Sequence, residues 1–189
     1  MIDELNKYWG GHLDGCEALA HELKNTFNER WVRFHALPDS KRYPSTENEY
    51  QEIFSRHNSV LNELNRSADD LLVILPEYKE SKIPGKLESE LEKVFPVYEY
   101  WRTLDQFEEC GVYWHLHVAR VSSGSGKLNK LFRLVANDEV ANILIVVLAG
   151  NSVYHPYDGG ADIILPSIKI RDELKLKIVQ WLSKHPEGY

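Results

Sequence analysis

The chain has 189 residues, a formal net charge of −7 at pH 7, and a composition that is 43% hydrophobic and 27% charged. This length and hydrophobic fraction are typical of a protein with one substantial core, so we expect residues 1–189 to form a single domain. The acidic balance argues against binding to nucleic acid, because the phosphates would be repelled.

The sequence gives no indication of export or of a membrane. The N-terminus lacks the basic and apolar regions of a secretory signal, and the most apolar run, residues 142–149, is far shorter than the roughly 20 residues that span a bilayer. Cys16 and Cys110 are isolated, without the spacing of a metal site. We therefore expect a cytoplasmic protein with reduced thiols, no cofactor and no metal.

The first predicted elements are a helix over residues 12–27 and a strand over residues 30–37. The helix has one apolar face at helical spacing, made by Leu19, Leu23 and Phe27, although Gly15 weakens its start. Side chains of the strand alternate between two faces. One face carries Val32, Phe34 and Ala36, and the other carries Trp31, Arg33 and His35.

A second helix is predicted over residues 46–65, and it begins with a capping box. Thr46 would accept a hydrogen bond from the backbone three residues on, and Glu49 would reach back to the helix start. An apolar stripe at helical spacing follows, made by Tyr50, Ile53, Phe54, His57, Leu61 and Leu64. We expect His57 to be a hydrogen-bonded core residue rather than a ligand. Residues 71–76 then predict a buried strand.

Residues 77–110 give the weakest structural signal, with one short amphipathic helix expected within residues 87–95. The segment holds nine acidic and five basic residues, so it contributes −4 to the net charge. Aromatic residues within a charged rim are typical of a protein interface. The alternative is that these aromatics close the core beneath a solvated helix. The interface hypothesis names Glu88, Glu90, Glu92, Tyr98, Tyr100 and Trp101.

Alternating side chains predict a half-buried strand over residues 111–121, and helical spacing predicts a helix over residues 127–136. The connection between them resembles a phosphate-binding loop. However, Val121 stands where that loop needs glycine, and Leu128 stands where it needs serine or threonine. We therefore exclude nucleotide binding.

His115 and His117 lie two residues apart on the strand at 111–121, so both side chains point the same way, as metal ligands on a strand do. Arg33 and His35 have the same spacing. If the two strands are neighbours, they form a polar patch rich in imidazole. A sheet face that is half open to water explains the pattern equally well.

Residues 142–165 predict a meander of three strands, of which the first is apolar, β-branched and buried on both faces. Gly150 and Asn151 favour a tight turn into the second strand, which ends near Pro156. The turn at residues 158–160 leads into the third strand. The polar residues of this meander are His155, Asp158 and Asp162. They either order the turns or place a carboxylate and an imidazole together at a functional site.

A last helix is predicted over residues 168–184, with a buried face made by Ile170, Leu174, Ile178, Trp181 and Leu182. Together the elements predict an α+β fold, with a mixed, mostly antiparallel sheet of five or six strands flanked by four or five helices. The meander at 142–165 should form the centre and one side of the sheet. The helices at 46–65 and 168–184 should cover one face.

Two parts of the sequence resemble a bacterial family of unknown function. Residues 154–167 and the helix after them are similar to the C-terminus of that family, which typically shows a His-x-Tyr-Asp-Asp-Arg-Gly-x-Asp turn. Residues 31–35, 55–57 and 69–73 resemble its earlier blocks. Here the turn is the shorter Asp-Gly-Gly at 158–160, which lacks the arginine. The resemblance implies a fold and no activity, and immunity partners of secreted toxins offer only an analogy.

Two classes of function are compatible with these patterns. The first is a cytoplasmic binding protein with a protein partner, such as an immunity protein that neutralises a basic toxin steered to the acidic face. The second is a hydrolase-type or metal-dependent enzyme, whose candidate groups must converge on one pocket; they are His115, His117, His155 and Asp158. Because no known catalytic motif is present, we expect binding rather than catalysis.

Overall fold

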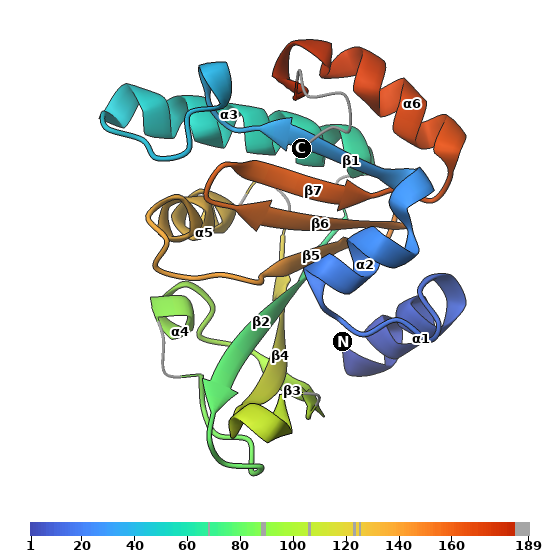
Figure 1. The fold of residues 1–189 in the computed structure, drawn as a ribbon, viewed down its shortest axis with the longest axis vertical. Coiled ribbons are helices and arrows are strands. Elements are labelled where there is room, and N and C mark those ends of the chain that lie inside the picture. The colour runs from blue at the N-terminus through green and yellow to red at the C-terminus, as the bar shows by residue number, and fades with distance from the viewer. Residues whose placement is uncertain (68, 88–89, 106, 123, 125, 184–189) are drawn as a thin grey trace.

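The computed structural model describes residues 1–67, 69–87, 90–105, 107–122, 124 and 126–183. Within this part of the chain, six α-helices and an open antiparallel sheet of seven strands form an α+β fold (Figure 1). The expected fold class is confirmed. The predicted five or six strands and four or five helices were each too few, because two elements near residues 1–11 and 99–104 were not assigned from the sequence.

The helices are α1 Ile2–His12, α2 Ala20–Thr26, α3 Glu47–Leu64, α4 Glu90–Val94, α5 Lys127–Ala136 and α6 Ile168–Lys177. The strands are β1 Trp31–His35, β2 Leu71–Lys79, β3 Glu99–Leu104, β4 Tyr113–Val121, β5 Leu144–Val147, β6 Ser152–Tyr157 and β7 Gly160–Ile164. Their order in the sheet is β1-β7-β6-β5-β2-β4-β3. The meander β5-β6-β7 therefore runs from the centre to one side, as predicted.

One end of the sheet extends beyond the rest. On β2, the pairing with β5 covers only residues 72–74, whereas the pairing with β4 covers the whole length of β2. Beyond residue 74 of β2, the sheet continues with only three strands (Figure 1). We call this three-stranded part the distal ribbon; it consists of β3, residues 75–79 of β2 and residues 113–117 of β4. Pro76 lies in β2 just beyond the residues that pair with β5. Proline has no backbone N–H, and none is needed there for a hydrogen bond to β5.

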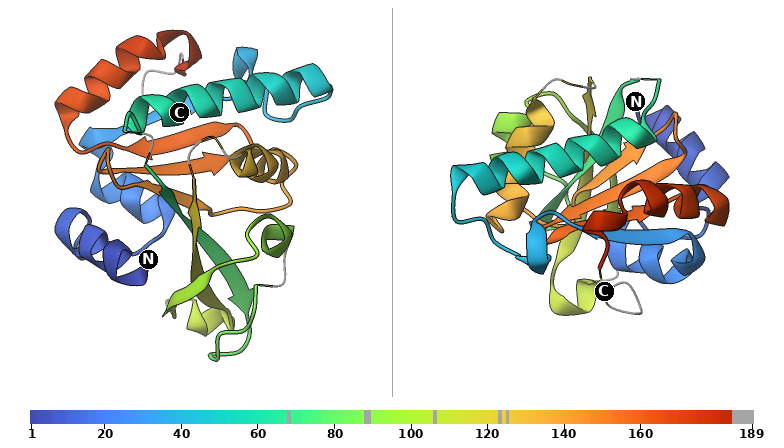
Figure 2. Two further views of the ribbon diagram at one scale, coloured as in Figure 1. Left: turned by 180° about the vertical axis from the view of Figure 1, so that it is seen from behind. Right: turned by 90° about the horizontal axis from the view of Figure 1, so that it is seen from above.

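Helices cover both faces of the sheet (Figure 2). The α3 face packs against α3, α4, α5 and α6, and its core includes Phe34, Val73 and Tyr154. The α1 face packs against α1 and α2, and its core includes Leu72 and Val153. Because side chains alternate along each strand, neighbouring residues of one strand enter different cores. The predicted covering of one face by the 46–65 and 168–184 helices is confirmed.

Local capping and packing define α3 as the sequence indicates. The Thr46 hydroxyl accepts from the Glu49 backbone N–H, and the Glu49 carboxylate accepts from the Thr46 backbone N–H, so the capping box is complete. His57 is buried with its Nδ1 2.5 Å from the Tyr154 hydroxyl, and its ring stacks on Phe132. It is a hydrogen-bonded core residue, as expected.

Three predicted elements need correction. The helix predicted over 12–27 is only α2, because Gly15 adopts a φ of +74° that breaks a helix, and α1 precedes it. The last helix, predicted over residues 168–184, ends at Lys177, and residue 184 lies outside the described residues. Its Ile170 side chain was expected to be buried but is 39% exposed. β4 is buried on both sides rather than half-buried, because α1 packs against one face, while Ser81 and Tyr98 contact His115 and His117 on the other.

The β5-β6-β7 meander depends on two close backbone approaches. Asn151 takes a φ of +45° in the turn between β5 and β6, which agrees with the expected turn chemistry. At position 160, an added Cβ would lie 1.9 Å from the backbone oxygen of Phe34. Glycine is therefore required for β7 to pack against β1. No helix in the described ranges is long and apolar enough to cross a bilayer.

Candidate functional site

A group of polar side chains lies on the α1 face where β1, β7 and β6 run side by side. The strand register places Arg33 opposite Asp162, and Asp162 opposite His155. In the next row, His35 and Tyr157 flank Gly160. We call these five side-chain-bearing residues the polar cluster: Arg33, His35, His155, Tyr157 and Asp162. It joins two segments, 31–35 and 154–162, that carried the family resemblance.

An ion pair forms the centre of the polar cluster. Arg33 donates from Nε to Oδ1 and from Nη2 to Oδ2 of Asp162, each at 2.7 Å. The Asp162 side chain is only 10% exposed, so this fork-shaped pair is largely shielded from water. The Arg33 guanidinium also lies 4.9 Å from the centre of the Tyr157 ring. The pair therefore fixes the position of a cation at the middle of the cluster.

Both imidazoles of the polar cluster are neutral at pH 7. Burial lowers the pKa of His155 to about 4, the Asp162 carboxylate opposes part of that shift, and Arg33 adds to it. The pKa of His35 is also lowered, first by burial and then by Arg33 and Arg56. Burial raises the pKa of Tyr157 to about 12, so its phenol stays protonated. The cluster thus presents neutral hydrogen-bonding groups around one ion pair.

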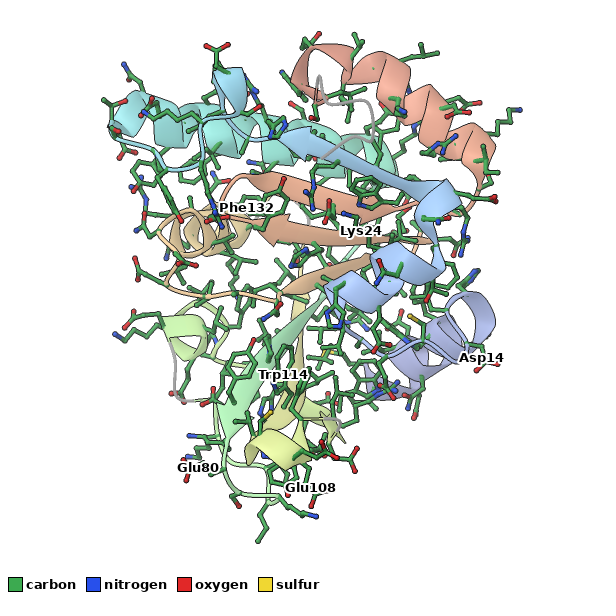
Figure 3. All side chains as sticks on the ribbon, viewed as in Figure 1. Asp14, Lys24, Glu80, Glu108, Trp114 and Phe132 are labelled. Carbon is green, nitrogen blue, oxygen red and sulfur yellow. The ribbon has the colours of Figure 1, made fainter. Side chains whose placement is uncertain are left out.

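Lys24 brings a second cation to the polar cluster from α2 (Figure 3). Its Nζ lies 4.3 Å from the centre of the Trp31 ring, on the strand that carries Arg33. The pKa of Lys24 is lowered, first by burial and then by the charge of Arg33. The lowered pKa of Lys24 thus reflects mainly burial, and in smaller part a second cation on the same face of the sheet.

A loop after β1 holds the turn between β6 and β7. Asp39 and Ser40 take φ values of +54° and +56°, which are uncommon for residues with a side chain. The loop delivers Arg42, whose Nε donates to Asp158 Oδ2 at 2.5 Å, and Tyr43 also hydrogen-bonds this carboxylate. Asp158 therefore orders the turn at the border of the polar cluster, which was one of its two expected roles.

His115 and His117 lie on the opposite face of the sheet. His115 is fully buried, its Nδ1 is 2.7 Å from the Thr103 hydroxyl, and its Nε2 is 2.8 Å from the Ser81 carbonyl oxygen. His117 packs between the rings of Tyr98 and Tyr100 at 5.2 and 5.9 Å. Burial lowers the pKa of His117. Both histidines are buried within the distal ribbon.

The four candidate residues of the enzyme hypothesis do not meet. β4 and β6 are separated by β2 and β5, so three strand spacings, about 14 Å, lie between His117 and His155. His117 also shares the α3 face with Leu75, whereas His155 shares the α1 face with Val153. The anticipated patch of His115 with His35 is likewise not formed, because β1 and β4 are not neighbours. Across the described ranges, no group of three or more His, Cys, Asp or Glu side chains is arranged to hold a metal ion.

The aromatic residues expected at a partner interface are divided between both faces. Tyr100 is 43% exposed, and Tyr98 is half-buried, with its hydroxyl accepting from the Leu87 backbone N–H. Trp101 is buried in the α1 core, where its Nε1 donates to Asn6 Oδ1. Because neighbouring side chains of a strand point to opposite faces, Trp101 does not share a surface with Tyr100.

The acidic residues named with these aromatics lie in and near α4. Glu90 is exposed and forms an ion pair with Lys93 at 2.6 Å. Glu92 is also exposed in the first turn of α4. Glu88 lies outside the described residues. Neither Arg42 nor Lys24 was among the candidate site residues predicted from the sequence. The only signal in the sequence was a basic residue in a loop for Arg42 and in a helix for Lys24.

A family model described as a domain of unknown function (DUF3885) matches residues 19–186. No curated protein and no solved structure matches the chain.

Proposed function

We propose that this chain, which belongs to the family of the domain of unknown function DUF3885, works by binding a partner protein at its distal ribbon. The observation that carries the proposal is the position of β3, which forms one edge of the seven-stranded sheet. Within the described part of the chain, β4 is the only strand that pairs with β3. An open strand edge presents backbone donors and acceptors to another chain.

The opposite edge of the sheet is better protected. The main chain at Phe34 in β1 forms a bridge with Leu182, and the His35 carbonyl oxygen accepts from Arg56 Nη1 at 3.0 Å. Leu182, and Arg56 of α3, therefore protect part of the β1 edge. The two edges differ in this respect, which supports an interaction function for β3 in particular.

Exposed apolar side chains lie on β3, just before it, and on the connection after β2. Val97, just before β3, is 80% exposed, and Ile83 on the connection after β2 is 78% exposed. Tyr100 on β3 adds an aromatic ring that is 43% exposed. Single exposed apolar residues are ordinary, but Val97 and Tyr100 lie close together along the open edge strand, which favours a surface that a partner covers.

Acidic side chains near the same edge favour a basic partner. Glu92, Glu99 and Asp105 are exposed and form no ion pair with another described residue. The segment 77–110 carries a charge balance of −4. Association with a basic surface would be accelerated by this charge and weakened by salt.

In its more specific form, the proposal is that this chain is an immunity protein and that its partner is the toxin it neutralises. Such a toxin would have a basic active surface, and the acidic distal ribbon would bind to that surface. We place the pair in the bacterial cytoplasm, since Cys16 and Cys110 are both free thiols and a reducing compartment keeps them so.

The test begins by capturing partners from the native host with the purified protein and re-expressing each captured protein. We expect the dissociation constant of the genuine partner to rise with salt. We also expect Glu99→Lys to weaken binding by about tenfold, while Asp14→Lys, an equal charge reversal between α1 and α2, leaves binding nearly unchanged. Equal effects of the two variants would show that general charge, and not the ribbon, controls binding.

A further inference from the structure

A cleft of about 380 Å³ lies among α3, α4 and α5 and shares no residue with the polar cluster. α5 contacts both of the other helices and lies between them (Figure 1). All of the lining residues belong to these three helices, so the walls of the cleft are regular structure. Its volume falls within the range of about 300–1,000 Å³ that is usual for small-molecule sites.

The floor of the cleft is apolar. Each helix contributes one apolar side chain to the lining: Phe54 from α3, Val94 from α4 and Leu134 from α5. Phe54 is 7% exposed, and the other two are half-buried and pack against the core of the α3 face. An apolar group of a ligand would complete the burial of Val94 and Leu134, which is favourable.

The rim of the cleft is basic. Lys93, Lys130 and Arg133 line it, against one acidic side chain, that of Glu90. Even when Glu47, which binds Arg133, is counted, the bases outnumber the acids by three to two. The whole chain carries −7, so the cleft has the opposite sign of charge from the molecule around it. An anion would be attracted to it.

Two of these cations have donors available for a ligand. Arg133 donates from Nη2 to Glu47 Oε1 at 2.6 Å, and its guanidinium lies 4.0 Å from the centre of the Tyr50 ring and 5.4 Å from that of Phe54. These contacts fix the guanidinium over the aromatic floor, while its Nε and Nη1 form no hydrogen bond with another described residue. Lys130 is exposed and has no ion pair within the described ranges.

We propose that this cleft binds a small carboxylic acid with an apolar chain, of the medium-chain fatty acid class. The carboxylate accepts hydrogen bonds from Arg133 and Lys130, and the chain packs on the apolar floor. The excess of one positive charge, with Glu47 counted, matches a monoanion better than a phosphate dianion. The site goes beyond partner binding at β3, because no lining residue belongs to that strand.

The test uses octanoate as the probe and the full chain with labelled leucine and valine methyl groups, observed by NMR at pH 7 and constant ionic strength. We expect the methyl signals of Val94 and Leu134 to shift and saturate together. Leu176, 78% exposed on α6, is an internal control whose methyl signals should not follow that curve. Octanol, which has the same chain without the charge, should bind about tenfold more weakly. Acetate, which lacks the chain, should not saturate over the same concentrations.

Three variants decide the assignment. Lys130→Gln should weaken octanoate binding by about threefold, the loss expected for one exposed charge contact, and should leave octanol binding unchanged. Lys175→Gln removes the same charge from an exposed position of α6 and should change neither. Val94→Thr, which replaces a methyl group by a hydroxyl, should weaken octanoate and octanol alike. Octanoate that shifts neither cleft methyl, octanol that binds as tightly as octanoate, or equal effects of the two lysine variants would overturn the proposal.

Discussion

Acidification should destabilise this protein in part through His57. The side chain is only 2% exposed, its Nδ1 is 2.5 Å from the Tyr154 hydroxyl, and its ring stacks on Phe132. Burial lowers its pKa from 6.5 to about 3. The folded protein therefore keeps this imidazole neutral at a pH where the unfolded chain protonates it.

The size and sign of the effect follow from linkage. Below pH 6.5 the unfolded state binds a proton at His57 that the folded state does not, so stability is full above this pH and is lost as the pH falls from 6.5 toward 3. One pKa unit corresponds to about 1.4 kcal/mol, so lowering the pH from about 7 to about 5 should cost about 2 kcal/mol at this residue.

Urea unfolding at these two pH values measures the loss. His57→Gln keeps a hydrogen-bonding group for the Tyr154 hydroxyl but does not titrate, so we expect its stability to fall about 2 kcal/mol less than that of the wild type. His21→Gln, an exposed position on α2, should retain the wild-type pH dependence. If His57→Gln also retains it, the buried neutral imidazole is not the source.

Three further stability predictions are checked by the same unfolding measurement. Gly160→Ala should destabilise by several kcal/mol because the new Cβ would lie 1.9 Å from a β1 backbone oxygen, whereas Gly10→Ala in α1, with no atom within 4 Å, should stabilise by up to about 1 kcal/mol. Thr46→Ala should cost about 1 kcal/mol by removing the α3 N-cap, and an unchanged stability would contradict the capping geometry. In α6, Leu174→Ala should cost about 2–5 kcal/mol and the 78% exposed Leu176→Ala less than about 0.5 kcal/mol, so equal losses would refute the assigned buried face.

Local signals in the sequence were sufficient for several elements. The capping box at Thr46 and the apolar stripe after it define α3, and α5 spans 127–136 as its spacing predicts. In contrast, α1 was missed although Leu5, Tyr8 and Trp9 have helical spacing, since Gly10 and the glycine after it are poor helix formers. Packing against the sheet stabilises that helix, and such packing is not visible in the local sequence.

The polar cluster was only partly accessible to sequence reasoning. His155 and Asp162 were recognised as a candidate pair at a hairpin, but their partner Arg33 is 129 positions from Asp162 along the chain. Pairing between such distant segments depends on the tertiary fold. Trp101 illustrates a different limit: alternation along β3 puts it on the opposite face from Tyr100, but residues 99–104 were not recognised as a strand from the sequence.

Hydrogen–deuterium exchange tests the central claim, partner binding at the open edge of β3, most directly. The protein would be compared alone and in complex with its purified captured partner. We predict that backbone amides within residues 99–104 exchange more slowly in the complex, because an added chain covers the free edge of this strand. Unchanged exchange in residues 99–104, with protection confined to another part of the surface, would contradict the account.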